Sequence, residues 1–126
     1  MQEVIRKLKF RGPAVVVNAP AELAASFQKE GLQSGLPNKG TSANTLVFVN
    51  NAKEFTQFLG KQLKLVEPDS VLWFAYPKGT SKIKSDINRD ILRVTGEQSG
   101  ITTVAAISID ATWSALRFRP IEKVGS

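Results

Sequence analysis

The sequence contains no cysteine and no histidine. Their absence excludes a thiolate nucleophile, an imidazole general base and a zinc site built on these residues. Acid–base chemistry would then fall to aspartate, glutamate, lysine or tyrosine, and tyrosine occurs only once. These absences weigh against an enzyme, and we expect no catalytic residue and no metal site.

Long hydrophobic runs are missing as well. The start of the chain, Met1–Lys7, lacks the apolar core of a secretory signal. No stretch approaches the ~20 apolar residues that a membrane span needs. Together with the lack of cysteine, which fits a reducing compartment, this predicts a cytoplasmic protein with no membrane contact.

The bulk composition is that of a single folded unit with a basic surface. The chain has 126 residues, of which 42% are hydrophobic. We therefore expect one α/β domain over 1–126, with 1–12 and 121–126 peripheral. The net charge of +6 favours anionic partners, although the basic residues are dispersed.

Apolar segments alternate between strand-like and helix-like patterns, which is typical of βα units. The strand patterns cover 14–18, 45–49, 70–75, 101–109 and 114–119. The helix patterns cover 21–29, 52–66 and 87–98, and 32–44 is predicted to be a loop. The last two strands must form an antiparallel hairpin because so short a link excludes a parallel crossover.

Two helices carry specific expectations. Asn51, followed three residues later by Glu54, predicts a capping box for the helix over 52–66. The helix over 87–98 is expected to be capped by Ser85 or Asp86. Its expected sheet-facing residues are Ile87, Ile91 and Val94.

These elements predict a three-layer, five-stranded, mainly parallel sheet that ends in an antiparallel hairpin. Their order and spacing resemble the C-terminal half of the class I methyltransferase fold, a Rossmann-like architecture, in truncated form. That resemblance implies that strands 15–17, 45–49 and 70–75 lie side by side, with the last strand inserted next to 70–75.

The chain departs from that family where a cofactor would bind. The family's glycine-rich first turn is replaced by Asn18-Ala19-Pro20, which contains no glycine. The acidic residue that would hold a ribose has no counterpart, because the loop over 32–44 occupies its place. S-adenosylmethionine and dinucleotides are therefore disfavoured, and we expect no cofactor.

Three segments carry a closer, local resemblance. VVVNAP, LWFAYPKGTSKIKSDINRD and AISIDATWSALRFRP occur in this order. They resemble a bacterial family of small domains that has no assigned function. The resemblance implies a fold and no activity.

Candidate ligand-binding residues lie where the predicted parallel strands end. Ligands of open α/β sheets bind outside the carboxyl ends of the strands. Asn18, Asn50, Tyr76 and Lys78 occupy those ends. The alternative is that these asparagines simply form turns and helix caps.

The segment after the third strand offers an anion site. The loop over 78–84 contains Lys78, Thr80, Ser81 and Lys82 ahead of a helix N-terminus, a combination that suits phosphate or carboxylate. The alternative is an ordinary solvated loop.

The start of the helix that follows carries further candidates. Asp86 and Arg89 either point into the same crevice or form ion pairs at i, i+3 on the helix surface with Asp90 and Arg93.

The final strand places two arginines on one face. Alternation puts Leu116 and Phe118 on one side, and Trp113, Ala115, Arg117 and Arg119 on the other. Arg117 is expected either to pair with an aspartate (Asp110, Asp86 or Asp90) or to bind an anionic ligand.

The interpretation that fits best is a non-catalytic binding or interaction module on a degenerate methyltransferase-like scaffold. One alternative is an enzyme or binder for a small anionic molecule, using Tyr76, Lys78 and Asp86. The other is nucleic-acid binding near Lys82 and Arg117, which ranks last because interleaved aromatic residues are lacking. A protein partner or self-association remains open.

Overall fold

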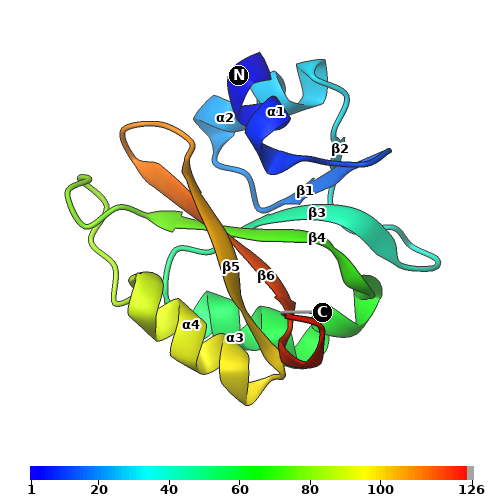
Figure 1. Ribbon diagram of the computed structural model, residues 1–126. Helices are drawn as coiled ribbons and strands as arrows, with labels where there is room; N and C mark the ends of the chain where they lie inside the picture. The colour runs from blue at the N-terminus through cyan, green and yellow to red at the C-terminus, as the bar shows by residue number, and fades with distance from the viewer. Residues whose placement is uncertain (125–126) are drawn as a thin grey trace.

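The computed structural model describes residues 1–124 and has an α/β fold with a six-stranded mixed sheet. Figure 1 shows the sheet with helices on both faces. The helices are α1 (Gln2–Leu8), α2 (Ala21–Lys29), α3 (Ala52–Lys61) and α4 (Arg89–Gln98), with 3₁₀ turns η1 (Leu63–Leu65) and η2 (Ile121–Lys123). The strands are β1 (Val15–Val17), β2 (Gln33–Ser34), β3 (Ser42–Phe48), β4 (Val66–Pro77), β5 (Ile101–Ser108) and β6 (Trp113–Pro120).

The strand order β2-β1-β3-β4-β6-β5 confirms the predicted topology. β1, β3 and β4 lie side by side and parallel, and β6 inserts antiparallel between β4 and β5. The sheet has one strand more than expected, because β2 pairs parallel with β1 inside the predicted loop over 32–44. This strand consists of two exposed polar residues without a hydrophobic period, so no sequence pattern indicates it.

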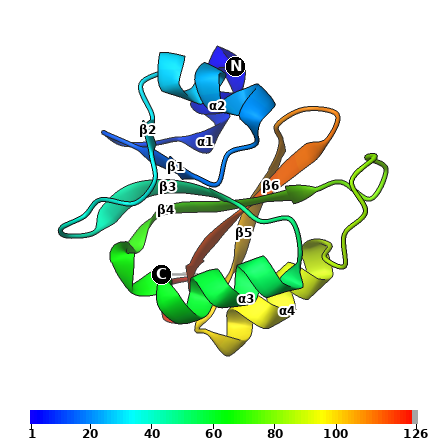
Figure 2. The same cartoon turned by 180° about the vertical axis from the view of Figure 1, so that it is seen from behind.

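The sheet separates two hydrophobic cores. Figures 1 and 2 show, from opposite sides, the helices that cover its two faces. α1 and α2 cover one face, where Val16, Leu46 and Trp73 are buried. α3 and α4 cover the other face, where Val17 and Phe74 are buried. The alternation follows from strand geometry and confirms the three layers. Within residues 1–124, no helix combines the length and the apolar character needed to cross a membrane.

The amino-terminal segment is less peripheral than expected. Leu8, at the end of α1, is completely buried in the core under that helix. Its carbonyl oxygen accepts a hydrogen bond of 2.9 Å from Nε1 of Trp73. A short helix with one anchoring residue has too weak a period to be assigned from sequence. At the other terminus, residues 121–124 are exposed and 125–126 lie outside the described residues.

α3 is shorter than its sequence pattern predicts. Phe55, Phe58 and Leu59 are buried, but the helix ends at Lys61 rather than at Val66. Val66 instead begins β4 and pairs with Ser42 of β3. The apolar spacing continues through η1 into the strand, which is why the pattern extends beyond the helix.

α4 presents a different face to the sheet from the predicted one. It begins at Arg89 and is capped by Asn88, whose Oδ1 accepts a 2.9 Å hydrogen bond from the Ile91 amide. Ile87 is buried ahead of the helix, but Ile91 and Val94 are 39% and 48% exposed.

The buried face of α4 is formed by Leu92 and Gly96. A Cβ at Gly96 would lie 2.8 Å from Cε2 of Phe118. The missing side chain therefore permits close packing that a count of apolar residues does not reveal.

A bulge in β4 shapes one end of the sheet. Ser42 of β3 pairs with Val66, but Asn44 already pairs with Val71, so residues 67–70 bulge out of the ladder. Asp69 in this bulge has a left-handed backbone with φ of 52°. Bulges of this kind re-aim side chains, and this one turns Asp69 toward β6.

Candidate functional site: an arginine pocket

The predicted candidates at the carboxyl ends of the strands lie on one edge, which we call the rim. Asn18 directly follows β1, Asn50 lies two residues beyond β3, and Tyr76 and Lys78 lie at the end of β4. Since β1, β3 and β4 are neighbours, the structure brings these ends together. Tyr76 belongs to β4 rather than to the following loop.

Hydrogen bonds within the chain use up much of the rim's polarity. The backbone amide and Nδ2 of Asn50 donate to Oε1 of Glu54 at 3.0 and 3.1 Å. The hydroxyl of Ser85 donates to the carbonyl of Asn50 at 2.6 Å. The Ala52 amide donates to Oδ1 of Asp86 at 2.8 Å. Asp86 therefore caps α3, not α4, and takes a position where an external anion would bind.

The capping box of α3 is confirmed with one difference. The side chain of Asn51 accepts a 2.9 Å hydrogen bond from the Glu54 amide, as predicted. Glu54 reaches back to the amide of Asn50 rather than to that of Asn51 itself. The alternative interpretation of the asparagines as turn and cap residues thus holds for both Asn50 and Asn51.

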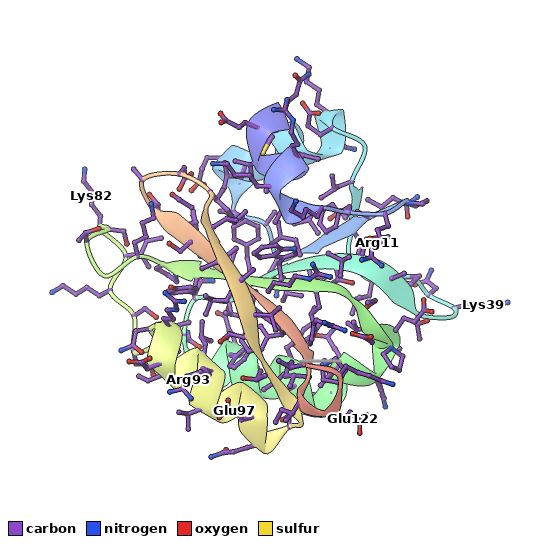
Figure 3. The ribbon with its side chains drawn as sticks, in the orientation of Figure 1. Arg11, Lys39, Lys82, Arg93, Glu97 and Glu122 are labelled. Atoms are coloured by element: carbon purple, nitrogen blue, oxygen red, sulfur yellow. The ribbon has the colours of Figure 1, made fainter. Side chains whose placement is uncertain are left out.

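The basic loop does not gather its charges at one point. Nζ of Lys78 donates to Oγ of Ser108 at 2.7 Å, toward the end of β5. Lys82 is exposed and points outward from the loop (Figure 3). Thr80 is exposed, and Ser81 is hydrogen-bonded within the loop to the Ile83 carbonyl at 3.4 Å.

Tyr76 and Arg89 lie on the α3/α4 side of the rim. Tyr76 packs against the core of that face. Burial raises the pKa of its hydroxyl, and the charge of Arg89 acts in the opposite direction. The predicted i, i+3 pairs on α4 do not form. The ion pair on this helix within residues 1–124 joins Arg93 to Glu97 at 3.5 Å.

Arg117 lies away from the rim, on the α1/α2 face of the sheet. Leu116 and Phe118 are buried on the α3/α4 face, which confirms the predicted alternation of β6. Arg117 is opposite Trp73 in the ladder, whereas Trp113 at the rim end of β6 is opposite Pro77. Four residues of strand, or about 13 Å, therefore separate Arg117 from the rim.

Around Arg117 the structure forms a polar cavity of about 370 Å³, which we call the arginine pocket. Its lining consists of Arg11, Asp69, Val104, Ala105, Arg117 and Arg119. Arg11 comes from the segment between α1 and β1 and is labelled in Figure 3. Three cations and one carboxylate thus surround one space, and their net charge is positive.

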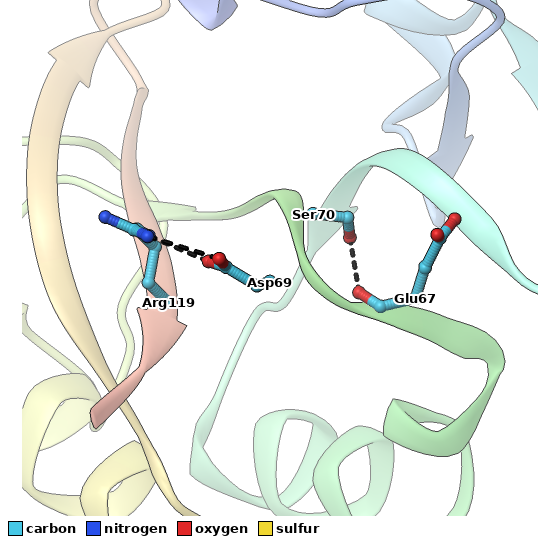
Figure 4. A network of polar contacts seen from close by, with 4 residues as sticks. All are labelled: Glu67, Asp69, Ser70 and Arg119. Atoms are coloured by element: carbon cyan, nitrogen blue, oxygen red, sulfur yellow. Dashed lines mark hydrogen bonds and ion pairs between the residues drawn. The ribbon is translucent and has the colours of Figure 1, made fainter. Parts of the chain in front are cut away.

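The single carboxylate of the pocket is already paired. Nε and Nη2 of Arg119 donate to the two carboxylate oxygens of Asp69 at 2.9 and 3.2 Å (Figure 4). The hydroxyl of Ser70 donates to the Glu67 carbonyl at 2.6 Å and fixes the bulge that carries Asp69. The hydrogen bond from Arg119 lowers the pKa of Asp69, so this carboxyl stays ionised.

Arg117 has no such partner. Its Nε is buried and makes no hydrogen bond with any group in residues 1–124. Burial lowers the pKa of Arg117, and the like charges of Arg11 and Arg119 act in the same direction. Burial and the neighbouring positive charges therefore make the charged form of Arg117 less favourable, and an anion bound in the pocket would offset this free-energy cost.

The predicted pairing of Arg117 with an aspartate is therefore wrong. Asp110 instead closes the hairpin turn, accepting 2.8 Å hydrogen bonds from the amides of Thr112 and Trp113. Asp86 caps α3, and Asp90 is exposed in the first turn of α4.

Sequence reasoning missed Arg11 and Asp69 as members of this site. For Asp69 a signal exists, because Glu67-Pro68-Asp69-Ser70 is a turn-type sequence directly ahead of an apolar strand. The prediction of a helix over 52–66 followed by a strand over 70–75 left no place for the bulge. For Arg11 no sequence signal exists, since it reaches the pocket from the segment that follows α1, and α1 packs on this face of the sheet.

Comparison with solved structures identifies the architecture. A SAM-dependent methyltransferase from Aquifex aeolicus superposes with a TM-score of 0.55 at 10% identity, covering 93% of this chain and 87% of that one. A candidate tRNA (m1A22) methyltransferase from Streptococcus pneumoniae gives 0.52 at 13% identity, covering 94% and 68%. The chain has a methyltransferase-like fold.

The likeness concerns the fold alone. The resemblance to methyltransferase folds that the order of the elements predicted is confirmed at this level. No protein-family profile and no curated protein sequence matches this chain. The methyltransferase-like fold therefore carries no assignment of family or activity.

The residues at the first turn of this methyltransferase-like fold do not fit S-adenosylmethionine. Asn18 adopts the left-handed conformation, with φ of 59°, that a glycine would take, but it carries a side chain. Pro20 lacks an amide hydrogen that could contact a ligand. The strand after this turn, β2, is followed by Gly35 and Leu36 and offers no carboxylate for a ribose.

Proposed function

We propose that this chain is a non-catalytic binding module that holds a small anionic ligand, a carboxylate or a phosphate, in the arginine pocket. The observation that carries the proposal is Arg117, whose buried Nε has no hydrogen-bond partner in residues 1–124. A buried donor without an acceptor costs about 1–3 kcal/mol, and more when it is charged. An anion supplies the missing acceptor and the missing charge.

The chemistry of guanidinium groups favours this ligand class. Arginine presents a planar fork of N–H donors that matches two oxygens of a carboxylate or phosphate. Arg119 already uses its fork on Asp69. Neither Arg11 nor Arg117 has a carboxylate within ion-pair distance in residues 1–124. The cavity volume of about 370 Å³ falls in the range of small-molecule sites, roughly 300–1,000 Å³.

The rim supports a function less well. An enzyme using Tyr76, Lys78 and Asp86 needs polar atoms available for substrate. Nζ of Lys78 and Oδ1 of Asp86 instead serve internal hydrogen bonds. The resemblance of three sequence segments to a bacterial family of small domains supplies no activity that favours catalysis.

A thermal-shift screen tests the proposal. The panel contains inorganic phosphate, citrate, sugar phosphates and nucleotides. A ligand at 100 times its Kd adds about 2.7 kcal/mol to the free energy of unfolding, which raises the Tm by several degrees. We expect at least one anion to produce this shift, and Arg117→Met to abolish it.

The matched control is Arg93→Met, which removes an arginine on α4 that forms a surface pair with Glu97. This variant should respond to the anion like the unmodified protein. A shift that persists in Arg117→Met, or a panel without any shift, would overturn the proposal. Tight binding of single-stranded oligonucleotides that weakens steeply with salt would favour the nucleic-acid alternative instead.

A further inference from the structure

β5 forms an open edge of the sheet. It is last in the strand order, and its neighbour within residues 1–124 is β6. Its sequence, ITTVAAIS, contains no charged residue and no proline. Soluble proteins usually protect such an edge with charges, proline or a covering element. The backbone donors and acceptors of this edge are therefore available to another strand.

The exposed part of this edge is apolar. Val104, Ala105 and Ala106 are all exposed, Val104 to 39%. The register against β6 shifts at Val104 and is regular from Ala105 to Ser108. The segment 105–108 thus offers an uninterrupted stretch for pairing.

The open edge and the arginine pocket are contiguous. Val104 and Ala105 line the pocket, and Ala105 is directly opposite Arg117 in the β5–β6 ladder. Adjacent strands place opposite side chains about 4.5–5.5 Å apart on the same face. The methyl group of Ala105 leaves room for a side chain from an added strand to reach Arg117.

We propose that the β5 edge and the arginine pocket together bind an extended acidic segment of a partner protein. The segment adds as a further strand along 105–108, and one of its aspartate or glutamate side chains enters the pocket. Backbone hydrogen bonds supply affinity and the carboxylate supplies specificity, as in other cases of strand addition. This inference rests on the proposed function and names its anion as a peptide carboxylate.

Charge favours an acidic partner over a second copy of this chain. Antiparallel self-pairing around Ala105 would bring two arginine pockets next to each other across a two-fold axis. Like charges in such positions destabilise the pairing. The chain as a whole carries a net charge of +6, which adds to the repulsion between copies.

A display library of random nine-residue peptides, selected on the full chain, tests the inference. We expect selected peptides to be rich in aspartate and glutamate and poor in proline. In the strongest peptide, replacing the central acidic residue by its amide should weaken binding at least tenfold. With Arg117→Met the same replacement should change binding less than twofold, and Arg93→Met should behave like the unmodified protein.

Hydrogen exchange locates the peptide. Bound peptide should protect amides of residues 105–108 and leave those of the rim unchanged. Selected peptides without acidic enrichment, or protection elsewhere, would overturn the inference while a phosphate or citrate shift leaves the proposed function standing. Loss of that shift as well would remove both. Self-association in sedimentation, with 105–108 protected in the absence of peptide, would assign the edge to a second copy and also overturn the inference.

Discussion

The two ends of the sheet carry polar side chains that are satisfied in opposite ways. At the rim, the side chains of Asn50, Ser85 and Asp86 form hydrogen bonds with neighbouring groups of the chain. These bonds cap the start of α3 and connect it to the loop before α4. In the arginine pocket, Arg117 keeps a buried donor without a partner in the described chain. Trp113, at the rim end of β6, also has a buried Nε1 without a partner in residues 1–124, but this donor is neutral and lies in an apolar core. The feature that points to a ligand is therefore the unpaired charge of Arg117 beside a polar cavity.

The difference has a physical origin in the elements that carry these groups. The rim residues flank helices, whose amino ends need acceptors, and short polar side chains supply them. In the pocket, Arg117 and Arg119 lie on β6, Asp69 lies on the bulge of β4, and Arg11 lies between α1 and β1. Val104 and Ala105 of β5 complete the lining. Arg119 pairs with Asp69, but Arg11 and Arg117 have no carboxylate within ion-pair distance in residues 1–124, so their charge remains uncompensated.

The largest expected effect concerns the packing that supports the pocket from behind. Gly96→Ala places a methyl group 2.8 Å from Phe118, the neighbour of Arg117 on β6. Overpacking of this kind costs about 1–3 kcal/mol. Urea denaturation should show this decrease in the free energy of unfolding. The anion should still raise the Tm of the variant, because the substitution does not change the pocket.

Gly60→Ala is the matched control for this change. Gly60 also lies inside a helix, but a Cβ there meets nothing within 4 Å. The alanine should stabilise the protein by about 0.4–1 kcal/mol because it restricts the unfolded chain. Equal effects of the two substitutions would mean that α4 does not pack on β6 as described.

The next effect belongs to the rim. Asn51→Ala removes the hydrogen bond to the Glu54 amide that caps α3. Loss of such a cap costs about 1 kcal/mol, within a range of roughly 0.5–2 kcal/mol. The anion response should be unchanged, because the rim serves the fold. A variant of normal stability that no longer responds to anions would instead place the ligand at the rim.

In the pocket the sign of the stability effect should reverse. Arg117→Met removes a partly buried cation beside two like charges and keeps an apolar stem of similar length. Replacing such a charge by a hydrophobic residue is often neutral or stabilising. We expect a change between zero and about 1 kcal/mol of stabilisation in urea denaturation, together with loss of anion binding. Marked destabilisation would show that Arg117 is a structural residue.

The sequence predicted those parts of the fold that are marked by an uninterrupted apolar run or by a short connection between strands. The apolar runs around Val16, Val47 and Phe74 indicated central parallel strands, and the short link before Trp113 required an antiparallel hairpin. The predictions were wrong where an apolar pattern continues beyond the end of an element or includes an exposed residue. The apolar spacing of α3 continues to Val66, beyond the end of the helix, and Ile91 of α4 is exposed although its spacing is that of a buried residue.

The candidate site was predictable only in part. Strand alternation correctly placed Arg117 and Arg119 on the face of β6 opposite Leu116 and Phe118. The neighbours of Arg117 were not predictable, since Asp69 and Ala105 come from the two strands next to β6 and Arg11 comes from the segment after α1. The general rule that ligands bind at the carboxyl ends of the strands favoured the rim, where Asp86 instead caps α3 and Lys78 binds Ser108.

The smallest expected effect concerns the ion pair between Asp69 and Arg119 in the arginine pocket, and it depends on pH. The hydrogen bond from Arg119 lowers the pKa of Asp69 below its ordinary value of 3.8. The unfolded chain therefore takes up the proton first as the solution is acidified. The pair's contribution to stability is present above pH 3.8 and is lost as pH falls through the lower pKa of the folded state.

Asp69→Asn tests this contribution, because it removes the charge and keeps the left-handed backbone that both residues tolerate. Thermal unfolding should show a lower Tm for this variant than for the unmodified protein at pH 6, and the difference should shrink as the pH falls below 3.8. A difference that does not change with pH would mean that the charge of Asp69 does not stabilise the folded chain.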